Sequence, residues 1–143
     1  MEQVIAAAQK CNAQLIDITG GAPELNPHFR TFVTALRKAG FTVVVRTNLT
    51  VFFTGGLSDM PQFFRENNVR LVASLPCYLE ENVTLQRGSG VFKNSVKAIQ
   101  MLNAEGYGIK PELPLTLVYN PVGPFLPPVQ NDLEEAYRSE LKK

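Results

Sequence analysis

Apolar positions along this sequence alternate between helical spacing and short, nearly unbroken runs rich in β-branched residues. Such runs predict buried strands, whereas apolar residues three or four positions apart predict amphipathic helices. Strands are predicted at residues 14–18, 41–45, 70–75 and 115–119. Helical faces are predicted at residues 4–11, 29–36, 63–64, 92–103 and 133–141.

Capping residues mark the ends of two of these helices. Asn26 is predicted to cap the second helix, with Pro27 at the first helical position, where its missing N–H costs nothing. Gly40 is predicted to end the same helix, because glycine readily adopts the left-handed conformation of a C-terminal stop. Asn131 and Glu134 have the spacing of a capping box, which predicts the start of the last helix.

The alternation of strands and helices predicts an α/β fold in a single domain, residues 1–143. Strands that are apolar throughout and joined by amphipathic helices form a parallel sheet covered by helices. Right-handed crossovers then bring the carboxyl end of every strand to one edge, where ligands bind in α/β proteins. About four strand–helix units are too few for a closed eight-stranded barrel. They form either a compact open sheet or a slice of a larger barrel.

Charge and hydropathy exclude several classes of partner. The formal net charge is +1, which gives no indication of binding to nucleic acid or to an anionic membrane. No apolar run approaches the roughly 20 residues of a membrane span. The apolar stretch at residues 4–8 is too short for a secretory signal. We therefore expect a cytoplasmic protein.

Cysteine and histidine are scarce in this chain. Cys11 and Cys77 are the two cysteines, and their separation matches neither a zinc site nor a thioredoxin pair. Cys11 lies on a predicted helix, where we expect a small buried apolar residue. His28 is the one histidine and is expected at the surface, in the first turn of its helix. The sequence therefore predicts no metal site.

Polar and glycine residues follow all four predicted strands, at the edge where ligands are expected. Two adjacent glycines let a ligand approach the backbone, and strand-end amides and carbonyls bind ammonium or carboxylate groups. Because these residues converge on one edge, we expect a small polar or zwitterionic ligand. The sequence has no dinucleotide-binding loop, phosphate-binding loop or zinc-protease motif. The strand-end residues are 19–24 after the first strand, Thr47 and Asn48 after the second, Ser74, Cys77 and Tyr78 at the third, and Asn120 after the fourth.

These strand ends resemble motifs of the radical S-adenosylmethionine enzymes. Residues 17–25, D-I-T-G-G-A-P-E-L, are similar to the T-G-G-E-P segment that ends the second barrel strand of that family. Ala22 stands where the family has its acidic residue, and Glu24 follows two positions later. Residues 46–48, R-T-N, resemble the T-N-G ending of the third strand, with leucine in place of the glycine. Residues 73–77, A-S-L-P-C, resemble the S-L-D-G ending of the fourth.

The resemblance implies a cofactor side and a substrate side at this edge. Arg87 resembles the arginine that pairs with the carboxylate of S-adenosylmethionine, a role that suits the fork of a guanidinium. The substrate side is expected at Cys77, Tyr78 and Asn120. The residues expected to bind the cofactor are Gly20, Gly21, Glu24, Asn48, Ser74 and Arg87.

Residues 20–24, 75–82 and 119–124 resemble, more narrowly, the arsenosugar-biosynthesis branch of the family. This resemblance implies an iron–sulfur oxidoreductase that reductively cleaves S-adenosylmethionine, and it implies that the chain spans strands two to five of a partial (β/α)6 barrel. The family's C-x-x-x-C-x-x-C loop, whose thiolates hold a 4Fe–4S cluster, has no counterpart here. We therefore expect a truncated barrel that carries no cluster and performs no radical chemistry alone.

Alternatives remain open at this point. Cys77 is either a soft ligand for an arsenical substrate or an incidental loop cysteine. The chain is either the core of an enzyme acting on a small molecule, or a stand-alone, non-catalytic α/β domain that binds a nucleotide or a small acid. A truncated barrel would also expose sheet edges, which predicts self-association through them.

Overall fold

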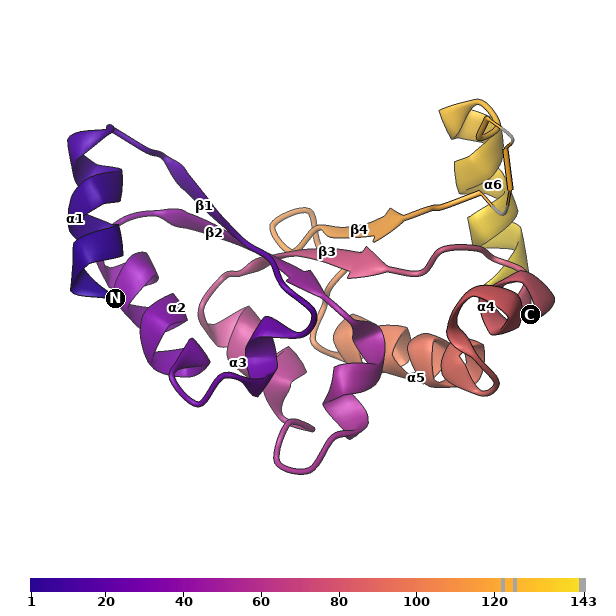
Figure 1. Ribbon diagram of the computed structural model, residues 1–143, viewed down its shortest axis with the longest axis horizontal. Coiled ribbons are helices and arrows are strands. Elements are labelled where there is room, and N and C mark those ends of the chain that lie inside the picture. The colour runs from indigo at the N-terminus through magenta and orange to yellow at the C-terminus, as the bar shows by residue number, and fades with distance from the viewer. Residues whose placement is uncertain (122, 125, 142–143) are drawn as a thin grey trace.

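The computed structural model describes residues 1–121, 123–124 and 126–141 and has an α/β architecture. Its four strands form one parallel sheet in the order β1-β2-β3-β4, which is also their order along the chain (Figure 1). The predicted parallel sheet is therefore confirmed. The strands are β1 (Leu15–Ile18), β2 (Thr42–Thr47), β3 (Arg70–Ser74) and β4 (Leu115–Val118).

Helices connect the strands and follow the last of them. The longest helix, α5, has 14 residues. In the described part of the chain, no helix is long and apolar enough to cross a membrane. Two short 3-10 helices, η1 (Pro23–Leu25) and η2 (Leu49–Phe53), directly follow the loops that leave β1 and β2. The α-helices are α1 (Glu2–Lys10), α2 (Phe29–Lys38), α3 (Met60–Glu66), α4 (Glu80–Arg87), α5 (Val91–Ala104) and α6 (Gln130–Glu140).

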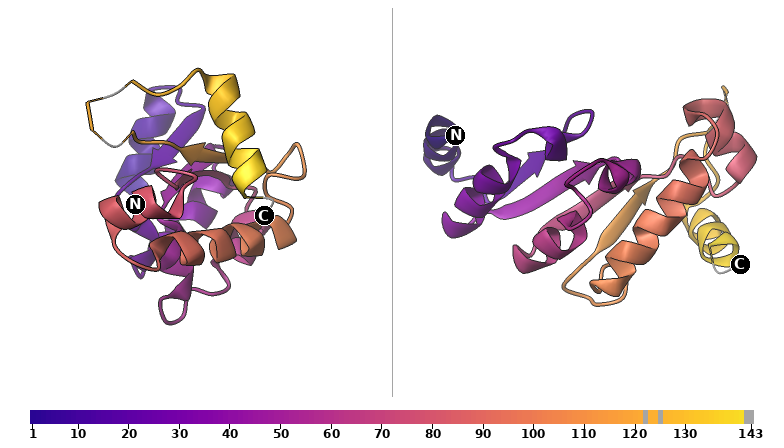
Figure 2. Two further views of the ribbon diagram at one scale, coloured as in Figure 1. Left: turned by 90° about the vertical axis from the view of Figure 1, so that its right-hand side faces the viewer. Right: turned by 90° about the horizontal axis from the view of Figure 1, so that it is seen from below.

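The two faces of the sheet differ in burial. Paired residues of parallel strands share a face, and Val45 pairs with Leu71 while Arg46 pairs with Val72. On the first face Val45 and Leu71 are buried, whereas on the second Val72 is half-buried and Arg46 is exposed. The helices α2, α3 and α5 lie side by side beneath one face, in chain order (Figures 1 and 2). We call this the covered face, and the other the open face.

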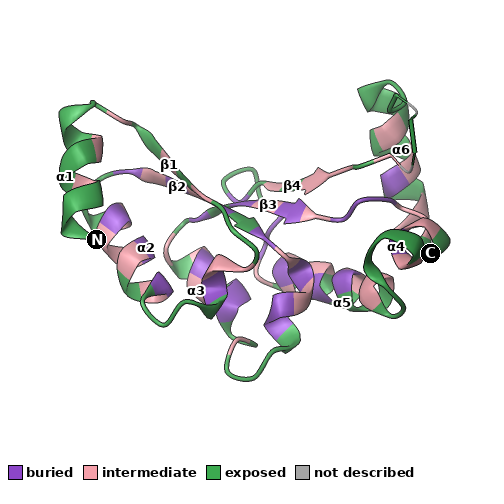
Figure 3. Ribbon diagram, in the orientation of Figure 1, coloured by how far each residue is buried: buried purple, intermediate pink, exposed green. Residues whose placement is uncertain are grey.

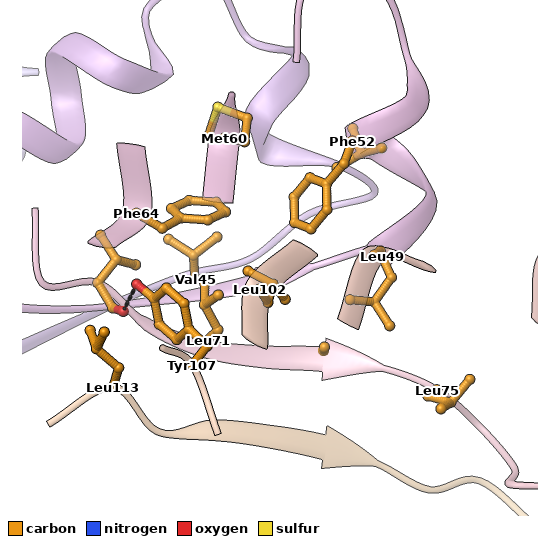
Figure 4. Close-up of a cluster of buried hydrophobic side chains, with 14 of the residues drawn as sticks. Val45, Leu49, Phe52, Met60, Phe64, Leu71, Leu75, Leu102, Tyr107 and Leu113 are labelled. Carbon is orange, nitrogen blue, oxygen red and sulfur yellow. Dashed lines mark hydrogen bonds between the residues drawn. The ribbon is translucent and has the colours of Figure 1, made fainter. Parts of the chain in front are cut away.

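The core fills the space between the covered face and these helices (Figure 3). Phe64 of α3 lies at its centre, in edge contact with Phe29 at 6.1 Å and with Phe52 at 6.3 Å between ring centroids. Tyr107 is also fully buried, and its hydroxyl donates a hydrogen bond of 2.7 Å to the carbonyl of Val69 (Figure 4). Its one polar atom is thus satisfied, so the ring contributes apolar burial without an unpaired donor.

The residues predicted to cap the amino ends of two helices are not their N-cap residues. The side-chain oxygen of Asn26 accepts a hydrogen bond from the backbone N–H of His28 at 2.9 Å, which makes a turn rather than a cap. Helix α2 therefore begins at Phe29, two residues after Pro27. Asn131 lies inside the first turn of α6, whose N-cap residue is Val129.

Other departures come from segments without a clear apolar period. Helix α4 was not predicted, because it buries only Val83 and leaves Leu85 78% exposed. Cys11 is exposed, which corrects the expected buried position: α1 ends at Lys10, and Asn12 turns the chain with a positive φ of 52°. His28 is exposed, as expected.

We expect Phe64→Ala to lower the free energy of unfolding by about 3–5 kcal/mol, because it leaves a large cavity in the core. Phe53→Ala is the matched control, since Phe53 is 47% exposed and should change stability by only about 0.5 kcal/mol. Chemical denaturation of both variants measures the difference. Equal losses would contradict the placement of the core.

Candidate functional site

The residues predicted to form a site do lie along the carboxyl edge of the sheet, because all four strands are parallel. The same edge carries α4, which follows the loop after β3 (Figure 1). A proline-rich segment, residues 120–128, also starts there, although Val122 and Phe125 lie outside the described residues. Around the edge, β1 is followed by Gly20, Gly21 and Glu24, β2 by Asn48, β3 by Cys77 and Tyr78, and β4 by Asn120.

Glu24 is the most unusual of these residues. Its side chain is only 4% exposed, although a carboxylate is seldom buried without a partner. In the described part of the chain, no hydrogen bond reaches either of its carboxylate oxygens or the neighbouring hydroxyl of Thr47. Thr47 is itself 1% exposed and ends β2 on the covered face. Two buried polar side chains therefore stand together without partners at the sheet edge.

The local sequence explains how Glu24 reaches this position. Pro23 begins η1, and the N–H of Asn26 closes the turn on the carbonyl of Pro23 at 3.1 Å. The resulting 3-10 turn packs against α2 and β2 and carries Glu24 inward. Gly20 and Gly21 precede it and are exposed, with no atom within 4 Å of a β-carbon built on either residue. The space over their backbone is thus open to a ligand.

Burial raises the pKa of the Glu24 carboxyl above 4.5. The nearby Thr47 hydroxyl and the backbone of Glu24 oppose this shift, although neither meets the geometry of a hydrogen bond. Two arginines of the adjoining elements α2 and β2 are engaged elsewhere: Arg30 pairs with Asp59 at 2.6 Å and Arg46 with Asp17 at 2.9 Å. The carboxyl thus lacks a compensating charge.

Asn48 and Ser74 differ in their availability to a ligand. The side-chain oxygen of Asn48 accepts a hydrogen bond of 3.1 Å from the hydroxyl of Thr50 and caps η2. Ser74 is half-buried and, by its position in β3, belongs to the open face, as does the ion pair between Asp17 and Arg46. The predicted cofactor residues therefore share an edge but lie on both sides of the sheet.

Cys77 is buried, with 2% exposure, and lies between the end of β3 and the start of α4. Its Sγ accepts hydrogen bonds from the N–H of Leu79 at 3.5 Å and from the side-chain amide of Asn82 at 3.4 Å. These two donors hold the sulfur at a fixed position at the amino end of α4.

Three tyrosines gather near this cysteine. The ring of Tyr137 in α6 contacts Tyr78 at 5.4 Å and Tyr119 at 6.4 Å between centroids, both at steep angles. The hydroxyl of Tyr137 donates to the carbonyl of Leu75 at 2.5 Å, which ties α6 to the end of β3. Burial raises the pKa of both Tyr119 and Tyr137, so their phenols are neutral. Of the substrate-side residues predicted from the sequence, Cys77 and Tyr78 thus lie beside neutral tyrosine rings.

Arg87 is the last residue of α4 and is exposed. The neighbouring Gln86 donates a hydrogen bond of 3.2 Å to the carbonyl of Asn120, which joins α4 to the end of β4. Arg87 thus lies at the β3–β4 part of the edge, whereas Glu24 lies at the β1–β2 part.

A groove of about 530 Å³ between α5 and α6 was not predicted as a site. The apolar stripe of the last helix was recognised in the sequence, but nothing local indicates which helix it would face. None of the nine predicted site residues lines this groove. Its apolar wall consists of Val96, Ile99, Leu115, Leu117, Tyr119, Leu133, Tyr137 and Leu141.

Within the described residues, no group of three or more histidine, cysteine, aspartate or glutamate side chains could hold a metal ion. Comparison of the chain with models of known protein families finds no match, and a search of curated proteins finds no significant one.

We expect Glu24→Gln to change how stability depends on pH. Burial raises the pKa of Glu24 in the folded chain, so protonation of Glu24 adds to the free energy of unfolding. This contribution is fully present below 4.5, the pKa in the unfolded chain, and is lost as pH rises through the pKa of the folded chain. The variant lacks this loss, so its stability relative to wild type should increase with pH above 4.5, by on the order of 1–3 kcal/mol.

Urea denaturation across this pH range measures the effect. Glu112→Gln is the control, because it makes the same substitution at an exposed position in the loop before β4. A difference between Glu24→Gln and wild type that stays constant with pH would show that Glu24 titrates normally.

Proposed function

We propose that this chain corresponds to strands two to five of a radical S-adenosylmethionine barrel and binds S-adenosylmethionine at the carboxyl edge of its sheet. The observation that carries the proposal is the buried carboxylate of Glu24, which lies beside Thr47 and has no hydrogen-bond partner among the described residues. An ammonium group would supply both the missing charge and the missing donors. The methionine part of S-adenosylmethionine carries such a group.

The winding of the sheet supports this assignment. Strand order follows chain order, and α2, α3 and α5 cover the same face (Figure 2). A doubly wound sheet would reverse direction at a switch point and carry helices on both faces. A singly wound sheet is the arrangement found in (β/α) barrels, where the open face lines the interior. The geometry thus favours a slice of a barrel over a doubly wound open sheet.

The other predicted residues would complete the cofactor site. The exposed backbone at Gly20 and Gly21 would contact the ligand closely, and Ser74 and the side-chain amide of Asn48 would contribute polar contacts. Arg87 would pair with the carboxylate of the cofactor. When bound, S-adenosylmethionine supplies a sulfonium whose reductive cleavage yields a carbon radical.

The 4Fe–4S cluster of the family does not fit the residues of this chain. Such a cluster is held by several thiolates, whereas here Cys11 is exposed at the end of α1 and Cys77 is buried after β3. These two side chains belong to elements far apart in the fold. We therefore expect binding without radical chemistry from this chain alone.

The loops after β3 and β4 would face the substrate, next to Arg87 at the end of α4. Cys77 offers a sulfur held by two N–H donors, and Tyr78 and Asn120 border it on the loops after β3 and β4. Soft sulfur is a suitable ligand for arsenic, which is consistent with an arsenosugar precursor as the product of the parent enzyme.

A second candidate is a stand-alone α/β domain that binds a nucleotide or a small acid without chemistry. The lack of cluster-binding thiolates in this sequence favours it. The genomic reading frame separates the two candidates: a C-x-x-x-C-x-x-C segment encoded in frame upstream supports the enzyme and excludes the stand-alone domain.

We expect calorimetric titration with S-adenosylmethionine to detect binding to this chain. Glu24→Ala and Arg87→Ala should each weaken the affinity about 10- to 100-fold, because each removes a charged hydrogen-bond partner of the ligand. Glu112→Ala, which alters an exposed residue of the loop before β4, should leave the affinity unchanged. No binding by the folded wild-type chain would overturn the proposal.

We further propose that the chain self-associates through its sheet edges. Within the described sheet, β1 and β4 each have a neighbouring strand on one side only, so a row of backbone groups remains for pairing. Sedimentation equilibrium should show a mass that rises with concentration. Thr116→Lys, which places a charge on β4, should shift the chain toward monomer, whereas Thr31→Lys on the exposed side of α2 should not. A wild-type monomer at all concentrations would contradict self-association.

A further inference from the structure

We propose that Glu24 carries a proton in the free chain and releases it when an ammonium-bearing ligand binds at the carboxyl edge. This inference rests on the proposed function, because it concerns the same site, and it adds a regulation that the binding of S-adenosylmethionine alone does not require. It predicts that binding is coupled to pH through one residue of the protein.

The geometry around Glu24 supports a neutral side chain. A carboxylate that is 4% exposed has lost most of its hydration, and no hydrogen bond from a described residue replaces it. An unpaired buried charge costs so much free energy that the group neutralises instead. The pKa of Glu24 is correspondingly raised by burial.

No charged group on the neighbouring elements compensates the carboxyl. Turn η1 packs against α2 and β2, so these two elements supply its close neighbours. Arg30 pairs with Asp59, and Arg37 donates to the carbonyl of Phe41 at 2.8 Å. The remaining groups point elsewhere: His28 and Lys38 are exposed at the two ends of α2, and Arg46 pairs with Asp17 on the open face.

Protons and charges balance when the ammonium-bearing ligand binds beside Glu24. The ligand arrives as an ammonium ion and keeps its three protons. The Glu24 carboxyl loses its proton to solvent and becomes a carboxylate that accepts hydrogen bonds from the ammonium. Thr47 can then donate its hydroxyl proton to the same carboxylate, which satisfies both of the partnerless side chains. One proton is released for each ligand bound.

The release of a proton on binding makes the affinity for the ligand depend on pH. While Glu24 is protonated in the free chain, each unit of pH increase should strengthen binding about tenfold, since one proton leaves for each ligand bound. The gain ends once pH exceeds the pKa of Glu24 in the free chain. The site would therefore bind its ligand more weakly below the pKa of Glu24 than above it.

The test is calorimetric titration of S-adenosylmethionine into the whole chain between about pH 5.5 and 6.5, where an α-amino group with a pKa of about 7.7–8.0 remains protonated. Two buffers with different heats of ionisation reveal the number of protons exchanged. We expect wild type to release up to one proton per ligand, the number falling as pH rises through the pKa of Glu24, and Glu24→Gln to release none. Glu112→Gln and His28→Asn, both at exposed positions, should behave like wild type.

The outcomes separate the two proposals. Binding without proton release by wild type overturns this inference and leaves the proposed function intact, whereas absence of binding overturns both. A ¹³C NMR titration of the side-chain carboxyls in the free chain gives an independent result that needs no variant. We expect Glu24 to titrate above 4.5, the value of an unperturbed glutamate carboxyl; titration at or below that value would refute the inference.

Discussion

The structure depends on the burial of one face of a singly wound parallel sheet. Residues such as Val45 and Leu71 lie on the covered face because each crossover returns beneath the same side of the sheet. Phe64 and Leu102 fill the space from the helices. Since every strand runs in one direction, the same packing that stabilises the core brings all the strand ends to a single edge. The candidate site is thus a consequence of the core rather than an addition to it.

The two ends of this edge differ in their chemistry. Near β1 and β2, Glu24 and Thr47 are buried polar groups that find no hydrogen-bond partner in the part of the chain that the structure describes. Near β3 and β4, Cys77 lies in an aromatic setting formed by Tyr78, Tyr119 and Tyr137, whose polar atoms are neutral or satisfied. Such a division is consistent with our proposal that a charged cofactor and a softer substrate bind at neighbouring positions. Buried polar groups without partners are rare in stable folds, and they tend to mark functional sites.

The local sequence determined those helices and strands whose defining residues lie within a few positions of one another. Alternating or unbroken apolar runs located β1 to β4 correctly, and Gly40, with a φ of +89°, ends the helical segment as predicted. The positions of the strand-end residues at one edge also followed, since parallel strands leave no other arrangement. The apolar stripe of α6 was correct as well, with Tyr137 buried.

Only the tertiary structure decided the remainder, because it depends on contacts between distant segments. Asn26 could have capped α2 or made a turn, and the sequence does not distinguish these uses of one side-chain oxygen. Helix α4 has no apolar period, so only its place between β3 and α5 defines it. The burial of Glu24 required η1, α2 and β2 to come together. Sequence thus determined which residues reach the edge, whereas packing determined which of them are left without a partner.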